Sequence, residues 1–299
     1  MYIKVPKTGS STLAGINLRI AHRHLPQNSK LKRCRATYRH VKASKMKELL
    51  LPKNTTFMWT FIRNPASQFV SEYFHFKVGR KHVRPTLESF KHTNKNYDLK
   101  HPPQINFISH RLPLRTEDLI NNYTKKNLVQ EIMNEYDFIG VTERLDESLV
   151  ALRLILGLDA GDILYVSSKV SGGYDDGANG KCTKIPKAIL SQKMKKYLSS
   201  KEFNELTSVP KLLHQAANKS LDLTIQNTIG QDVFDKALEE HKYLMSLVNQ
   251  ICASKAIFPC SKEGKYQGLS RKNCYSSDNG CGYPCLDKIS LNYTVSLET

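Results

Sequence analysis

The sequence predicts an α/β protein in which a parallel sheet is flanked by helices, followed by a mainly helical part and a cysteine-rich tail. Short runs rich in aromatic and β-branched residues alternate with segments of helical period over the first half of the chain. Two of these runs end in polar loops that lead directly into helices, as at the carboxyl ends of parallel strands. The 299 residues allow one large domain with a small appendix, which we place at 1–252 and 253–299.

The first predicted strand, Ile3 to Val5, leads into a polar loop from Lys7 to Thr12. A helix from about Ser11 to His24 follows, because apolar residues recur there at helical spacing. The first turn of a helix carries unpaired N–H groups and the positive end of the peptide dipole. This junction is therefore suited to binding a phosphate or a sulfate.

The residue types in this loop support the same interpretation. Gly9 lets the backbone approach an anion closely, the hydroxyls add donors, and Lys7 supplies the one full positive charge of the loop. A nucleotide triphosphatase loop reads GxxxxGK[ST], with the lysine after the glycines, so a P-loop kinase or nucleotide hydrolase is disfavoured. The predicted anion-binding residues of the loop are Lys7, Thr8, Gly9, Ser10, Ser11 and Thr12.

A second anion site is predicted where the buried run from Thr55 to Arg63 ends. Pro65 suits the first position of a new helix, because its missing N–H costs nothing there. Arg63 at the strand end and Ser71, two turns into the helix, can reach one phosphate together. In this helix Phe69, Tyr73 and Phe76 are predicted to form an apolar stripe, with Ser67 and Ser71 on another face.

The remaining helices and strands are predicted from the periodicity of apolar residues and from glycine and proline at their ends. The stretch from Gly79 to Leu114 has little periodicity and is predicted to be a long binding loop. We also expect a helix from His40 to Pro52, a helix from Lys125 to Glu135, a strand from Asp137 to Val141, a helix from Thr142 that ends at Gly157, and a strand from Ile163 to Ser168.

The loop from Val170 to Lys181 is rich in glycine. It is either an ordinary surface loop or a flap that closes over a nucleotide, with Lys169 and Lys181 as weaker candidates for a phosphate contact. A long amphipathic helix near the end of the helical part carries His241, which we interpret as a helix-face residue.

Composition narrows the class of partner. The net charge is +18, from 45 Lys and Arg against 27 Asp and Glu, and this balance favours anionic partners. The lysines are scattered and no alternation of aromatic and basic residues resembles an RNA-binding module, so nucleic acid is not the expected partner. No apolar run has the length of a transmembrane helix. Because the key loop lies within a few residues of the start, we expect a further N-terminal segment outside this chain.

Five of the seven cysteines lie in the last part of the chain, at Cys252, Cys260, Cys274, Cys281 and Cys285. Their polar, glycine-rich surroundings favour a tail held by disulfides, as in secreted proteins. A zinc cluster is the alternative, but neither paired CxxC spacings nor nearby histidines support it. Sequons at Asn54, Asn122, Asn218 and Asn292 are compatible with a secretory location.

The segments PKTGSST, RNPASQFVSEY and FIGVTERLDESLVALRLILG together resemble the Golgi carbohydrate sulfotransferases of the galactose 3-O-sulfotransferase family. The first two motifs are similar to those of enzymes that use 3′-phosphoadenosine 5′-phosphosulfate (PAPS), and TERLDESLVALRL points to this family. The resemblance spans Ile3 to Ser168. Uronyl 2-O-sulfotransferases of glycosaminoglycans share the first loop and are the nearest competitor.

The resemblance implies a P-loop-like sheet, PAPS as co-substrate without a metal, and transfer of the sulfuryl group to the 3-hydroxyl of galactose on glycolipids or glycoproteins. It implies that Lys7 acts at the leaving oxygen, that Ser10, Ser11 and Thr12 hold the 5′-phosphate, and that Arg63 and Ser71 hold the 3′-phosphate. It also implies the Golgi lumen and a type II membrane anchor, which this chain does not contain. A non-catalytic, basic glycan-binding protein is the alternative from another class.

His40 is the predicted general base among the ten histidines. The segment TYRHVKAS lies between the two anion motifs and resembles the stretch that supplies the base in uronyl sulfotransferases. His75 lies inside the helix of the second motif, and His214 and His241 lie on distant helical segments. The other histidines end the first helix or belong to the irregular stretch, where nothing fixes their position.

Overall fold

A computed structural model describes residues 1–24, 40, 42–46, 56–95, 103–109, 122–175, 180–267 and 283–298. At its centre lies a parallel sheet of three strands in the order β1 (Tyr2–Ile3), β2 (Trp59–Ile62) and β3 (Phe138–Val141). Tyr2 pairs with Trp59, and Trp59 pairs with Phe138. Because the strands are parallel, their carboxyl ends lie at one edge, and the predicted fold class is confirmed.

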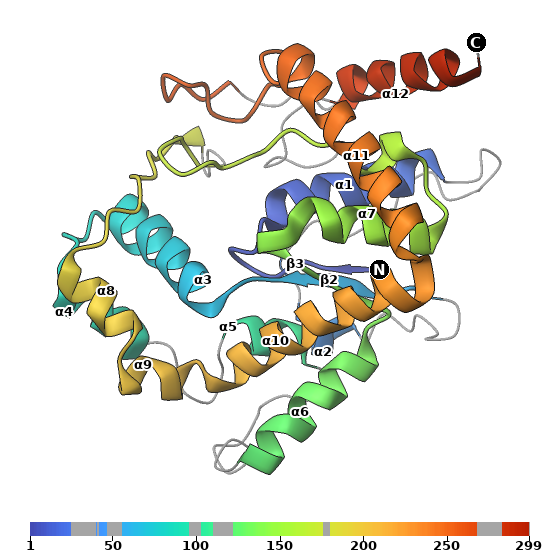
Figure 1. Ribbon diagram of the computed structural model, residues 1–299. Helices are drawn as coiled ribbons and strands as arrows, with labels where there is room; N and C mark the ends of the chain where they lie inside the picture. The colour runs from blue at the N-terminus through green and yellow to red at the C-terminus, as the bar shows by residue number, and fades with distance from the viewer. Residues whose placement is uncertain are drawn as a thin grey trace.

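The two faces of the sheet are covered by different helices (Figure 1). On one face Tyr2, Trp59 and Phe138 pack against α1 (Ser10–Arg23) and α7 (Leu145–Leu156). On the other face Ile3, Ile62 and Val141 pack against α2 (Ala43–Met46), α5 (Pro103–Ile108), α6 (Asn122–Glu135) and α10 (Ser208–Leu223). Alternate residues of a strand point to opposite faces, so each strand contributes to both cores.

Local sequence signals explain several of these boundaries. Gly157 ends α7 with a left-handed backbone (φ 61°), as predicted for a helix C-cap. Pro65 begins α3 (Pro65–Glu72), and the side chain of Asn64 accepts hydrogen bonds from the backbone N–H groups of Ala66 (3.0 Å) and Ser67 (3.2 Å).

The strand predicted from Ile163 to Ser168 is wrong. Asp159 and Asp162 form a capping box that starts the 3₁₀ helix η6 (Ala160–Ile163), and no ladder forms over the following residues. Carbonyl oxygens of Gly161 and Leu164 accept hydrogen bonds from the buried Arg19 guanidinium instead. Ile163 is buried with residues of α1 and Leu164 with residues near the C-terminus, which explains the strand-like pattern of the run.

The stretch from Gly79 to Leu114 is more regular than predicted, because it contains α4 (Leu87–Lys95) and α5 among its described residues. Of the helix predicted from His40 to Pro52, the structure describes α2; His40 and Lys42 are described but not helical, and the other residues lie outside the described part.

The helix of the second motif continues beyond α3 as the π-helix η3 (Tyr73–Gly79). Its wider turn changes which residues share a face. Phe69 and Tyr73 are buried as predicted. Phe76 is half-buried and lines the cavity described in the next subsection instead. The predicted stripe is therefore wrong at its third position.

The C-terminal helices lie against α1 and α7 (Figure 1). Leu286 and Ile289 of α12 (Tyr283–Glu298) belong to a core cluster with Leu164, and Asp287 accepts a hydrogen bond from Arg19 (2.8 Å). Disulfides join Cys252 to Cys285 and Cys182 to Cys260. The predicted staples are thus confirmed, whereas Cys34, Cys274 and Cys281 lie outside the described residues.

The remaining elements complete the largely helical second half of the chain. No helix among the described residues is long and apolar enough to cross a membrane. The further elements are η5 (Thr142–Arg144), α8 (Gln192–Leu198), α9 (Lys201–Leu206), η8 (Thr224–Ile229), α11 (Gln231–Leu247) and η9 (Val248–Cys252).

Candidate functional site

The loop between β1 and α1 has an unusual backbone. Lys7 and Gly9 both adopt left-handed conformations, with φ of 63° and 69°. Such a conformation is strained for a lysine, and strain of this kind is typical of functional sites. Among the residues that the structure describes, the other non-glycine residues with positive φ are His82 and Lys169, and Lys169 faces the same site as Lys7.

Gly9 is the N-cap of α1, so no side chain caps the first turn of this helix. Ser10 and Ser11, at the start of the helix, line a cavity of about 280 Å³. Two predicted anion-binding hydroxyls lie elsewhere. Thr8 is buried and donates to the carbonyl oxygen of Val5 (3.1 Å), and the Thr12 hydroxyl accepts from the backbone N–H of Ser168 (3.3 Å).

Four cationic side chains from separate parts of the chain line this cavity. Lys7 comes from the loop, Arg63 from the end of β2, Arg80 from the end of the π-helix and Lys169 from the segment after η6. A cavity with this charge is suited to a ligand with several negative charges. The complete lining is Pro6, Lys7, Gly9, Ser10, Ser11, His40, Arg63, Ser71, His75, Phe76, Arg80, Ser168 and Lys169.

A second cavity of about 460 Å³ adjoins the first and shares Lys7, Arg63, Ser71, His75 and Lys169 with it. Its other walls are more apolar. They include Val70, Phe74, Ile185, Pro186 and Leu190. The two cavities together offer cationic and apolar walls, and both are lined by Arg63 and Ser71.

Arg63 is held in place through its backbone. Its N–H donates to Gln104 Oε1, and its carbonyl accepts from Gln104 Nε2, both at 2.8 Å. Its Nη1 donates to the carbonyl oxygen of Lys7 (3.2 Å). Arg63 Nε and Ser168 Oγ are buried without a hydrogen-bond partner among the described residues. Unsatisfied buried donors beside a cavity favour an anionic ligand there.

Electrostatics reflect this crowding of positive charge. Burial, followed by the neighbouring charges of Lys169 and Arg63, lowers the pKa of Lys7 to about 8. Burial also lowers the pKa of Arg63. Mutual repulsion among the cations of this site therefore contributes to the lowered pKa of Lys7, and a multiply charged anion would relieve it.

His40 lies at the rim of the charged cavity and is exposed. Its Nδ1 lies 2.9 Å from the carbonyl oxygen of Lys4. A carbonyl can only accept, so Nδ1 carries the proton and Nε2 of the neutral ring carries the lone pair. This tautomer is the one that a general base at Nε2 requires.

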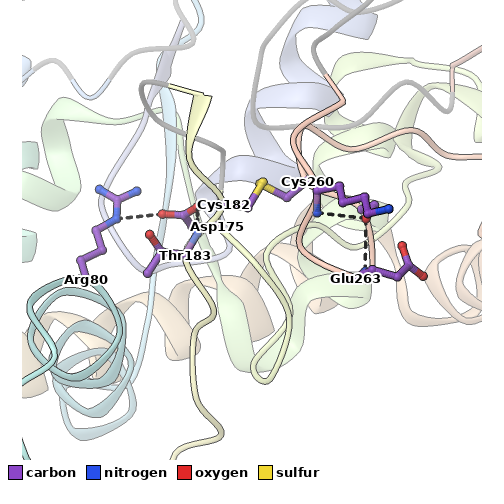
Figure 2. Close-up of a disulfide and its surroundings, with 8 residues drawn as sticks. Arg80, Asp175, Cys182, Thr183, Cys260 and Glu263 are labelled. Atoms are coloured by element: carbon purple, nitrogen blue, oxygen red, sulfur yellow. Dashed lines mark hydrogen bonds and ion pairs between the residues drawn. A yellow bond between two sulfur atoms is a disulfide. The ribbon is translucent and has the colours of Figure 1, made fainter.

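Sequence reasoning did not find His75, Phe76, Arg80 or Ser168. The π-helix brings His75 and Phe76 to the cavity, and Lys7 Nζ lies 5.9 Å from the centre of the Phe76 ring. Arg80 contacts Asp175 (Nε to Oδ2, 3.2 Å), as Figure 2 shows. A wide helical turn leaves no clear sequence signal, although the run after Ser71 is rich in aromatic and basic residues.

The glycine-rich loop follows Lys169, which borders the site. Lys169 lines both cavities, whereas Lys181 is exposed and lines neither. Residues 176–179 lie outside the described part. Cys182 joins this loop to Cys260 beside Asp175 and Thr183 (Figure 2). In the described ranges no group of His, Cys, Asp and Glu is arranged to hold a metal ion.

The fold and the site define an α/β protein with a cation-lined cavity, suited to a multiply charged anion, at the carboxyl ends of neighbouring parallel strands. A family model described as "Sulfotransferase family" matches residues 1–212, and the chain belongs to that family. No curated protein matches the chain. Membership implies sulfuryl transfer to an acceptor, with PAPS as the sulfate donor.

Proposed function

We propose that this protein is a PAPS-dependent carbohydrate sulfotransferase that acts on the 3-hydroxyl of galactose in glycolipid or glycoprotein glycans. The observation that carries the proposal is the joining of two anion-binding motifs in one cavity. Lys7 and the start of α1 provide one set of donors, and Arg63 with Ser71 provides the other. Two sets of donors in one cavity suit a ligand with two phosphate positions.

The described residues fit this donor. Ser10, Ser11 and the first turn of α1 would hold the 5′-phosphosulfate, and Arg63 and Ser71 the 3′-phosphate. Arg63 Nε would gain a partner for its buried N–H. The more apolar second cavity would take the adenosine, since Ile185 and Leu190 line it together with Arg63 and Ser71.

Bound PAPS supplies an activated sulfuryl group for transfer. His40 Nε2 carries the lone pair needed to accept the proton of an acceptor hydroxyl at the cavity rim. Lys7 places a positive charge where the leaving group gains negative charge, and its burial strengthens that interaction.

The identity of the acceptor rests on sequence resemblance. The segment TERLDESLVALRL favours the galactose 3-O-sulfotransferase type over uronyl 2-O-sulfotransferases. A galactose acceptor is in turn consistent with a location in the Golgi lumen as part of a type II membrane protein.

Transfer of labelled sulfate from PAPS to a panel of galactosides, desulfated heparan and desulfated chondroitin tests the proposal. Labelling of terminal galactosides is expected. Labelling of the uronic acids alone would replace the acceptor, and binding of glycans without transfer would favour a non-catalytic protein. Thermal shifts with adenosine 3′,5′-bisphosphate and with ATP plus magnesium provide a second test, in which the bisphosphate should stabilise the protein more.

A further inference from the structure

The dipeptide Thr142–Glu143 directly follows β3 and touches both anion-binding motifs. It belongs to the TERLDESL segment, to which the proposed function assigns no chemical role. Neither residue lines the charged cavity or the adjoining one. Their contacts nevertheless run to the loop before α1, to the end of β2 and to the start of α3.

Thr142 connects the first motif to the second. Its hydroxyl lies 3.1 Å from the carbonyl oxygen of Thr8 in the loop and 2.8 Å from that of Ile62 at the end of β2. One hydroxyl proton is shared between these two carbonyls, since a carbonyl can only accept. A methyl group of Thr142 would also lie 3.7 Å from a Cβ placed on Gly9, so the loop packs on this residue.

Glu143 holds the second motif. Its carboxylate accepts from the backbone N–H of Asn64, at 3.0 Å to Oε1 and 3.1 Å to Oε2. Oε1 also lies 3.8 Å from Arg63 Nε, on the guanidinium that faces the cavity. Glu143 thereby fixes both the entry into α3, which carries Ser71, and the direction of the Arg63 side chain.

The carboxylate is itself held from the opposite side. Nε2 of His214, on α10, lies 3.2 Å from Glu143 Oε2. Burial acts to raise the pKa of Glu143, but the hydrogen bonds from His214 and Asn64 hold it below its ordinary value. Glu143 is therefore a fixed anion beside the proposed anion site. Its charge alone would weaken the binding of an anionic ligand, unless Glu143 positions the Arg63 guanidinium for that ligand.

We propose that Thr142 and Glu143 are positioning residues that set the separation and direction of the two anion-binding motifs. This inference rests on the proposed binding of PAPS. Thr142 fixes the 5′-phosphosulfate loop to the end of β2, and Glu143 aims Arg63 and α3 at the 3′-phosphate. Both side chains act through other residues and contact no ligand.

Binding calorimetry with adenosine 3′,5′-bisphosphate and with adenosine 5′-phosphate tests this role. Glu143→Gln keeps an acceptor for Asn64 but removes the charge that faces Arg63. We expect about tenfold weaker binding of the bisphosphate, equivalent to about 1.4 kcal/mol, and less than about a twofold change for the monophosphate. Thr142→Val should also weaken the bisphosphate more than the monophosphate, because it loosens the link between the motifs.

Two further variants separate positioning from other effects. Because Glu143 acts through Arg63, the double variant Arg63→Ala/Glu143→Gln should bind the bisphosphate no more weakly than Arg63→Ala alone. Glu147→Gln is the matched control, since Glu147 lies four residues further on and pairs with Arg144 (2.5 Å) instead. It should leave both affinities unchanged.

The opposite sign would overturn the inference. If Glu143 were only a nearby negative charge, its neutralisation would tighten phosphate binding. An equal loss for both ligands, together with a lower melting temperature, would mark a general structural role and would also refute positioning. If the wild-type protein does not bind the bisphosphate at all, the proposed function fails and this inference fails with it.

Discussion

The guanidinium of Arg63 donates a hydrogen bond to the backbone carbonyl of Lys7, at 3.2 Å from Nη1 to the oxygen. This bond joins two motifs that lie more than fifty residues apart in the sequence. Nη1 of Arg63 is thus hydrogen-bonded to the loop, whereas Nε is buried without a hydrogen-bond partner in the described structure. The bond therefore fixes the Arg63 side chain beside the loop that carries Lys7.

Lys7→Met should lower the maximal rate of sulfate transfer by about 10²–10³-fold, because it removes a cation from the position where charge develops. The fold should remain intact, since the Lys7 side chain is only half-buried and forms no ion pair within the described part of the chain. Steady-state kinetics and a thermal melt measure the two effects. A variant with wild-type turnover would show that Lys7 is not part of the chemistry.

Bisphosphate affinity should fall as the pH rises through about 8, where Lys7 loses its proton. Phosphate binding favours the charged amine, so binding near this pH should be accompanied by proton uptake. Calorimetry in two buffers of different ionisation enthalpy measures the uptake, and Lys7→Met should abolish it. In the protein without ligand, the free energy of unfolding changes in the opposite direction and rises with pH. The depressed pKa means that charged Lys7 destabilises the fold fully below about 8, and this cost disappears as the pH approaches 10.5.

Arg63→Ala should weaken the bisphosphate by some tenfold to a hundredfold, because a charged hydrogen bond to phosphate contributes about 2 kcal/mol. Adenosine 5′-phosphate, which lacks the 3′-phosphate, should bind the variant nearly as well as the wild type. Equal affinity of both proteins for the bisphosphate would remove Arg63 from the 3′-phosphate site.

His40→Ala should lower the maximal rate about a hundredfold and leave bisphosphate affinity nearly unchanged. It should also remove the acidic limb of the pH–rate profile, because the base would no longer need to be deprotonated. His82→Ala serves as the control, since His82 is exposed and lines neither cavity. A His40 variant that keeps the limb would direct attention to His75, which lies within the cavity.

Removal of the disulfide between Cys182 and Cys260, by Cys182→Ser with Cys260→Ser, should weaken bisphosphate binding several-fold. Lys169, Ser171 and Ile185 line the adjoining cavity, and the bond at Cys182, three residues before Ile185, holds this part of the chain to Cys260 (Figure 2). Its closure of 78 residues stabilises the fold by up to about 4 kcal/mol in the chain-entropy model. Loss of the bond between Cys252 and Cys285 should lower the melting temperature with less effect on affinity.

The parts of the fold that follow from local chemistry were predicted from the sequence. The helix that ends at Gly157 and the one that begins at Pro65 each carry their own boundary signal. The run from Ile163 to Ser168 misled the prediction because a buried, irregular segment has the same apolar residues as a strand. Its conformation depends on Arg19, which is far away in the sequence.

The candidate site was partly predictable for the same reason. Lys7, Arg63 and Ser71 lie in compact motifs, and the structure brings them together at one cavity. Gln104 and Glu143 hold Arg63 across long sequence separations, which no local pattern reveals. The inward direction of Thr8 was also hidden, because the sequence does not show which hydroxyl turns back to its own strand.

The ion pair between the buried Arg19 and the half-exposed Asp287 spans 268 residues. Arg19 lies on the helix whose first turn forms the anion site, and Asp287 lies near the start of α12. Contacts of such long range form slowly, because the intervening chain must first be ordered. The first motif is synthesised before α12, so the contact between Arg19 and Asp287 can form only after α12 has been made. We therefore expect ligand binding to appear late in folding, after the sheet has formed.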